Sequence, residues 1–149
     1  MKFIATKELG KLSKWLRILG FDTEYYTQDN KSSLVISALR DERVVLTRLM
    51  RFPQGHGIKV LHINSDFVKE QIKQLINELG LRLEKEQMFS RCTICNQEVV
   101  AIEKEKIKDN VPEYVYRTQS DFSICPVCAR VYWQGSHWGN VSKILEEIK

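Results

Sequence analysis

The chain has 149 residues, of which 43% are hydrophobic and 28% are charged, and its formal net charge is +4. This share of apolar residues, with few Gly and Pro, excludes a disordered tail, and the length allows one domain or two small ones. The positive excess lies in residues 1–88, which carry 15 Lys and Arg against 11 Asp and Glu, whereas residues 89–149 carry 8 of each. A net charge of this size is by itself a weak argument for a nucleic-acid partner.

Neither a membrane span nor a secretory signal is expected. No apolar run approaches the roughly 20 residues that cross a bilayer. Residues 1–7 also lack the apolar segment of a secretory signal. We therefore expect a cytoplasmic protein that makes no contact with a membrane.

A short buried strand and a basic helix are the first predicted elements. Residues 3–5 form an apolar run typical of a buried strand, and a helix extends from about residue 7 to residue 19, where Gly20 can end it. Four leucines, at positions 9, 12, 16 and 19, recur at the spacing of one helical face. The basic residues on the opposite face and at its edge are Lys7, Lys11, Lys14 and Arg17. They form either an ordinary solvated surface or a stripe that follows the phosphates of a nucleic acid.

Strands and helices continue to alternate through the first part of the chain. The remaining elements are a strand at 23–27, a helix that Ser32 or Ser33 caps, a strand at 43–47, a loop, a strand at 58–63 and a helix at 66–79. Strands that alternate with helices in this way form a parallel sheet with both faces covered. The sequence therefore predicts an α/β fold.

Two Cys-x-x-Cys motifs hold all four cysteines of the chain: Cys92 with Cys95, and Cys125 with Cys128. Four thiolates at this spacing can surround a tetrahedral Zn²⁺, because each motif supplies two ligands from a tight turn. Disulfides would need an oxidising compartment, and a redox motif would need only one pair. We predict a zinc ion, and since protein ligands fill all four positions, its role is structural.

The region after Met88 is predicted to form a small β-rich zinc ribbon. Residues 98–102 and 114–116 are prone to form strands and can join the two cysteine motifs. A short helix is expected over 141–148, with Asn140 as its cap. This change of character divides the chain into an α/β domain at 1–88 and a ribbon domain at 89–149.

Aromatic residues gather near the end of the chain, at positions 132–138. Tyr132 and Trp133 can serve simply as core residues of the ribbon. Alternatively, Trp133 and His137 form a stacking platform for an unpaired base, next to the lysines of the first helix. Trp15 is expected to pack between the two domains.

Carboxylates are scarce where the predicted sheet should bind a ligand. Ligands collect at the carboxyl ends of parallel strands, and a metal-dependent nuclease needs several acids there because Mg²⁺ prefers oxygen ligands. The first predicted strand ends in Thr6 and the third is followed by Leu49. Asp29 and Asp66 remain as isolated acids, which are more often surface residues than partners in one metal site.

Several motifs together resemble the Mut-seven C-terminal RNase domain family. They lie at residues 9–23, at 45–48, in the two cysteine motifs and at 132–137. The resemblance spans nearly the whole chain, and it implies a PIN-like α/β ribonuclease domain followed by a zinc ribbon. It also implies RNA as the partner, and Mg²⁺ or Mn²⁺ as a further cofactor if the chain is an active nuclease.

Three positions depart from the pattern of that family. The family usually has Asp after the first strand, where this chain has Thr6, and Thr-Arg-Asp after the third strand, where this chain has Leu49 in place of the Asp. A further acid is expected just before the second helix, where residues 30–32 are not acidic, although Asp29 is close. Leucine cannot coordinate Mg²⁺, and a threonine hydroxyl is a poor replacement for a carboxylate. The resemblance thus implies RNA, while these residues argue against its cleavage.

We therefore predict an RNA-binding protein of PIN-like fold with a degenerate nuclease centre. The residues expected to contact single-stranded or structured RNA are Lys7, Lys11, Lys14, Arg17, Arg48, Arg51, Trp133 and His137. One alternative is an active metal-dependent ribonuclease that uses Asp29 and Asp66 as displaced acids. Another is an adaptor that docks a protein partner through the ribbon and the surface around residues 133–138.

Overall fold

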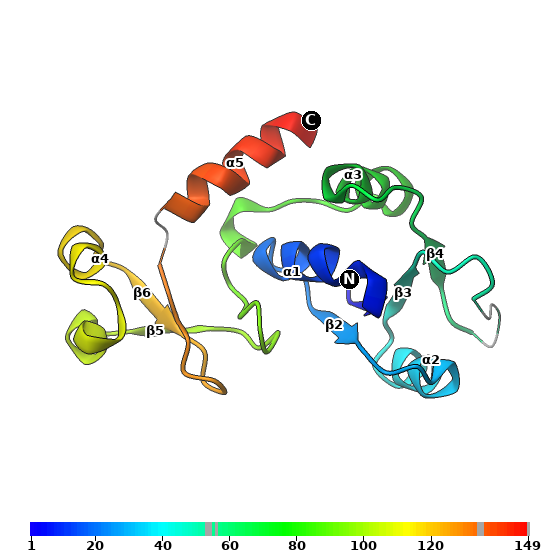
Figure 1. The fold of residues 1–149 in the computed structure, drawn as a ribbon, viewed down its shortest axis with the longest axis horizontal. Helices are drawn as coiled ribbons and strands as arrows, with labels where there is room; N and C mark the ends of the chain where they lie inside the picture. The colour runs from blue at the N-terminus through cyan, green and yellow to red at the C-terminus, as the bar shows by residue number, and fades with distance from the viewer. Residues whose placement is uncertain (53–54, 56, 134–135, 149) are drawn as a thin grey trace.

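The structure is a computed structural model that describes residues 1–52, 55, 57–133 and 136–148, with the backbone alone for residues 136–140. Among these residues no helix combines the length and the apolar character needed to cross a membrane. Figure 1 shows two parts joined by the last helix, with a parallel sheet in one part and a small antiparallel sheet in the other.

The first part is built on a four-stranded parallel sheet. Its strands are β1 (Phe3–Thr6), β2 (Thr23–Tyr26), β3 (Val44–Thr47) and β4 (Val60–His62), in the order β2-β1-β3-β4. Because all pairs are parallel, the carboxyl ends of the strands meet at one edge. The strand order reverses between β1 and β3, and such a switch point is where open parallel sheets form a ligand-binding crevice.

Helices cover both faces of this sheet (Figure 1). Successive side chains of β1 point to opposite faces, so that Phe3 and Ala5 enter one core and Ile4 enters the other. The first core contains leucines of α1 (Gly10–Ile18), which follows the short 3₁₀ turn η1 (Lys7–Leu9), and residues of α3 (Val68–Leu79). The second core is closed by α2 (Lys31–Arg40). The predicted α/β fold with a parallel sheet is confirmed.

The second part contains the cysteine motifs and a three-stranded antiparallel sheet. Its strands are β5 (Val100–Ile102), β6 (Phe122–Ile124) and β7 (Val131–Tyr132). A 3₁₀ turn, η2 (Lys85–Gln87), precedes this part, and the 3₁₀ helix η3 (Lys104–Asn110) and α4 (Glu113–Thr118) lie between β5 and β6. A small core forms where Ile107 and Val115 pack on Phe122.

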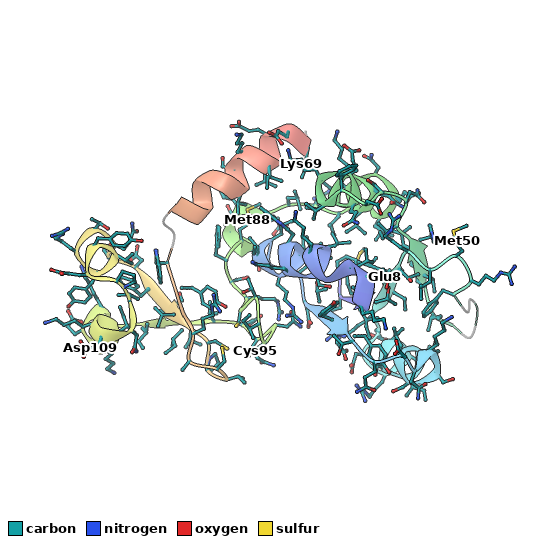
Figure 2. The ribbon with its side chains drawn as sticks, viewed as in Figure 1. Glu8, Met50, Lys69, Met88, Cys95 and Asp109 are labelled. Atoms are coloured by element: carbon teal, nitrogen blue, oxygen red, sulfur yellow. The ribbon has the colours of Figure 1, made fainter. Side chains whose placement is uncertain are left out.

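The terminal helix α5 (Ser136–Ile148) returns to the first part of the molecule. Val141 and Ile148 are buried in the core formed by α1 and α3, and Lys69 of α3 pairs with Glu147 of α5. Figure 2 labels Lys69 at this contact. The division of the chain after residue 88 stays a prediction, and α5 ties the two parts together.

The predicted strand at 114–116 is wrong, because these residues lie in helix α4. Alternating aromatic and β-branched residues resemble a strand pattern, but only Val115 of the three is buried, on the small core. Ile107, Val111 and Val115 recur every four residues, and all three are buried in that core. These three residues lie in η3, in the extended connection after it and in α4, so their burial comes from the packing of separate elements and outweighs the strand propensity of the two tyrosines.

Two predicted helix caps are also wrong. Asn30 caps α2, since its side-chain oxygen accepts a hydrogen bond of 3.0 Å from the N–H of Ser33, whereas Ser32 and Ser33 lie inside the helix. The last helix begins at Ser136, so that Asn140 is an internal residue rather than a cap. Both errors placed the start of a helix too late, where its apolar residues begin.

Candidate functional site

Four cysteine thiols converge in two turns next to the small sheet. The sulfur atoms of Cys92, Cys95, Cys125 and Cys128 all lie within 4.8 Å of one another, and those of Cys92 and Cys128 are 3.7 Å apart. Sulfur ligands about 2.3 Å from a tetrahedral metal are separated by about 3.8 Å. All four cysteines are free thiols. The cluster therefore has the donor atoms and the spacing of a four-thiolate metal site.

The two turns that present the thiols have the same backbone design. The carbonyl of Cys92 accepts a hydrogen bond from the N–H of Asn96, and that of Cys125 accepts one from Ala129, both at 2.9 Å. Asn96 and Ala129 each adopt a left-handed conformation, with φ of 64° and 63°. Each Cys-x-x-Cys motif thus folds its two thiols toward the same point.

Hydrogen bonds favour the thiolate form at Cys92. Burial alone would raise the pKa of this thiol, but the hydroxyl of Tyr132 at 3.0 Å and two backbone N–H groups lower it to about 7. At Cys95, hydrogen bonding to Cys128, burial and the neighbouring thiols raise the pKa to about 12. Four thiols this close cannot all lose their protons without a cation between them. A divalent metal with an affinity for sulfur fits the site, and Figure 2 labels Cys95 there.

The first cysteine turn is bound directly to the parallel-sheet part. The Arg17 guanidinium donates hydrogen bonds to the carbonyls of Thr93 at 2.8 Å and Ile94 at 3.2 Å. The Asn96 side chain accepts from the Thr23 N–H at 3.0 Å and donates to Asp22 at 2.6 Å. Arg17 was predicted to contact RNA, and the structure places its guanidinium in the joint between the two parts.

Glu8 occupies the carboxyl edge of the parallel sheet, at the switch point between β1 and β3 (Figure 2). Its Oε1 atom accepts hydrogen bonds from the Thr6 hydroxyl, from the Thr47 hydroxyl at 3.2 Å and from the Arg48 N–H at 2.9 Å. Burial raises the pKa of this carboxyl, but these hydrogen bonds outweigh burial and lower it below the ordinary value. An ionised carboxylate therefore bridges the ends of the two strands.

The sequence alone did not predict this role of Glu8. The chain was expected to enter a regular helix at residue 7, which would leave Glu8 on the helix surface. Instead, Lys7–Leu9 form a 3₁₀ turn, and Glu8 reaches back to Thr6 and across to β3. The one signal was an acid two residues after the end of a buried strand.

Asp29 and Asp66 each pair with a cation. The Lys7 ammonium lies 2.5 Å from Asp29, and an Arg48 guanidinium nitrogen lies 2.8 Å from Asp66. Hydrogen bonding and charge attraction to Asp29 raise the pKa of Lys7. Both aspartates are exposed. In the part of the chain that the structure describes, the four cysteines are the only cluster of His, Cys, Asp and Glu close enough to hold a metal.

A small cleft marks the position where the family's acids would be expected. Its volume is about 150 Å³, and its walls include Thr6, Lys7, Glu8, Asp29 and Leu49. Leu49 is 40% exposed, so an apolar group lines part of this cleft.

The residues predicted to contact RNA lie in different environments. Lys11, Lys14 and Arg51 are exposed, and none of them pairs with an acid among the described residues. Trp133 is half-buried and packs against Phe122, with ring centroids 6.4 Å apart. The side chain of His137 lies outside the described residues.

A parallel sheet with a switch point, followed by a small antiparallel sheet and a four-cysteine cluster, defines an α/β protein with a zinc-ribbon-like metal site. A comparison with protein families narrows this class. The model described as the Mut7-C RNAse domain matches residues 1–145, and the chain belongs to this family. No curated protein and no solved structure matches the chain.

Proposed function

We propose that the protein binds RNA at the carboxyl edge of its parallel sheet and along α1, and that it does not cleave RNA there. The family is one of ribonuclease domains. The observation that carries the proposal is the composition of the edge: Thr6 and Leu49 stand where acids are expected, and the acids Asp29 and Asp66 are bound to Lys7 and Arg48. Among the described residues, no cluster of carboxylates converges at this edge to hold a catalytic Mg²⁺ or Mn²⁺.

The same composition suits phosphate binding. Loss of carboxylates removes repulsion toward an RNA backbone, while Lys11 and Lys14 on α1 and Arg51 beyond β3 remain exposed. Lys7 and Arg48 can exchange their aspartate partners for phosphates, since both aspartates are exposed and the pairs are open to solvent. These residues extend from the strand ends along the first helix.

We further propose that the metal at the four cysteines is zinc and that its role is structural. An all-thiolate, tetrahedral donor set selects zinc over hard cations and leaves no position open for a reacting water. The thiols require a reducing environment to stay available to the metal, which agrees with a cytoplasmic location. Metal analysis of the purified protein should find one zinc per chain.

The binding proposal is tested with a labelled single-stranded RNA titrated over a range of salt concentrations. We expect the affinity to fall steeply with salt, and Lys11→Ala with Lys14→Ala to reduce the log–log slope by about 1.4, at about 0.7 per phosphate contact. Lys59→Ala is the matched control, because Lys59 is also exposed but lies just before β4, at the amino ends of the strands. If the RNA affinity does not change with salt concentration, the basic residues of α1 form only a solvated surface.

The second candidate is an active ribonuclease, and the fixed carboxylate of Glu8 favours it. Cleavage of the same RNA is measured with and without added Mg²⁺ or Mn²⁺; a chelator is avoided because it would also strip the cysteine site. The proposal predicts no metal-dependent cleavage. The opposite result would be metal-dependent cleavage that Glu8→Gln or Asp29→Asn abolishes and that Asp121→Asn on the ribbon leaves intact. The proposed function would then be RNA hydrolysis and not RNA binding alone.

A further inference from the structure

A second and larger cavity lies on the other side of α1, where this helix meets the small sheet. Its volume is about 410 Å³, within the range of about 300–1,000 Å³ typical of small-molecule sites. Its lining includes the aromatic residues Trp15, Tyr132 and Trp133, the exposed apolar residue Ile94 and the cations Lys14 and Arg130. We name this cavity the α1–ribbon pocket.

The aromatic walls of the pocket are held in place by contacts outside it. The Tyr132 hydroxyl donates to the sulfur of Cys92 at 3.0 Å and accepts from the Thr93 N–H at 3.1 Å. Trp133 packs on Phe122 of the small core. A flat ligand can therefore stack on rings that lose little freedom when it binds.

The charge of the pocket selects for an anion. Lys14 and Arg130 are exposed on its two sides, one from α1 and one from the turn before β7, and neither pairs with an acid among the described residues. None of the described residues that line the pocket is acidic. A ligand that combines a flat apolar ring with a negative charge fits this combination of walls.

We propose that the α1–ribbon pocket binds an unpaired base of single-stranded RNA, with the base against the aromatic walls and the adjoining phosphates at Lys14 and Arg130. This inference rests on the proposed RNA binding and adds the kind of RNA that is preferred. Lys14 and Lys11 lie on the same helix, so that a strand held in the pocket continues along α1 toward the strand ends. Base stacking of this kind tolerates any sequence, because every base has a flat face.

The test compares two probes of equal charge on the zinc-loaded full chain: a labelled single-stranded decaribonucleotide, and the same ribose-phosphate chain without bases. We expect the base-containing probe to bind about tenfold more tightly, since stacking depends on the base and phosphate contacts do not. Its binding should also quench tryptophan fluorescence. Trp133→Leu should remove most of this advantage, with circular dichroism and zinc content showing that the variant is folded.

A charge variant checks the phosphate side of the pocket. Arg130→Gln should weaken binding of both probes several-fold, whereas Arg117→Gln, an exposed arginine on α4 that does not line the pocket, should not.

If the wild-type protein binds the two probes equally tightly, the pocket does not bind a base, although the proposed RNA binding still holds. The same conclusion follows if both Trp15→Leu and Trp133→Leu still bind the base-containing probe more tightly than the probe without bases. Failure of both probes to bind would overturn the proposed function as well. In that case, an apolar side chain of a protein partner would fit the α1–ribbon pocket better than an RNA base.

Discussion

The cysteine cluster and the carboxyl edge of the parallel sheet are two places where the fold brings together residues far apart in the chain. At the cluster, all four thiols converge within 4.8 Å, and the donor set for a metal is complete. At the edge, the carboxylates of Glu8 and Asp29 line one small cleft, but Glu8 accepts hydrogen bonds from β1 and β3 and Asp29 pairs with Lys7. Among the described residues, the cysteines therefore form a complete donor set for a metal, and no second such cluster lies at the edge.

The cysteine cluster and the carboxyl edge differ in how much they contribute to the stability of the fold. Loss of a thiolate would remove the support of the small sheet, because that sheet has only a small core around Phe122. Substitutions at the carboxyl edge should leave the parallel sheet intact, because two hydrophobic cores hold it on both faces.

Removing one thiolate should have the largest effect. Cys125→Ser replaces a buried ligand, and structural zinc in comparable peptides contributes about 10–16 kcal/mol to folding. We expect the variant to lose its metal and the order of the small sheet, as measured by metal analysis and circular dichroism. Ser123→Ala on β6 is the matched control and should retain both. Full metal content in Cys125→Ser would contradict a four-thiolate site.

Adding two acids at the carboxyl edge of the parallel sheet should create a metal site there. Thr6→Asp with Leu49→Asp places two carboxylates beside Glu8, and their repulsion should lower the unfolding free energy by about 2 kcal/mol without a cation. Millimolar Mg²⁺ or Mn²⁺ should then raise the melting temperature by several degrees, because the cation binds only the folded state. The corresponding double Asn variant should not respond. If the Asp variant responds no more than the Asn variant, the edge lacks the geometry of a metal site.

Removing the charge of Glu8 should cost less. Glu8→Gln weakens charge-assisted hydrogen bonds from Thr47 and Arg48, and we expect a loss of about 1 kcal/mol in a denaturant titration at neutral pH. Glu86→Gln, an exposed residue of η2, is the control and should leave the stability unchanged.

The contribution of Glu8 should also depend on pH. Because the pKa of Glu8 is lower in the folded chain than its ordinary value of 4.5, the ionised carboxylate stabilises the fold above that pH. This stabilisation disappears as the pH falls through the lowered pKa. The difference in stability between the wild type and Glu8→Gln should therefore shrink in acid, and a difference that grows would contradict the hydrogen-bonded carboxylate.

The smallest effect should distinguish the two cysteine turns. Ala129 adopts a left-handed conformation that costs a non-glycine residue about 1 kcal/mol, so Ala129→Gly should raise the unfolding free energy by up to about 1 kcal/mol. Asn96→Gly removes the same strain but also the hydrogen bonds to Thr23 and Asp22. Thermal unfolding should show a gain for the first variant and a loss for the second, and equal responses would mean that the joint at Asn96 contributes nothing.

Much of the fold was predictable because its signals are local. Buried runs such as Phe3–Thr6 and Val44–Thr47, separated by helices with one apolar face, predicted the parallel sheet. Helix α4 was mistaken for a strand because Tyr114 and Tyr116 have a high strand propensity, while the burial of Val115 depends on a core that forms only when Ile107 and Phe122 meet.

The sequence by itself determined the metal site, since the spacing within each Cys-x-x-Cys motif dictates how a tight turn presents two thiols. Its resemblance to the family also predicted that Thr6 and Leu49 replace acids, and this stays a prediction. Only the tertiary structure decided the partners of the remaining charges: Glu8 with the N–H of Arg48, Arg17 with the carbonyls of Thr93 and Ile94, and Lys7 with Asp29. The physical reason is that turn geometry depends on neighbouring residues, whereas a hydrogen bond between distant residues depends on how strands and helices are placed against one another.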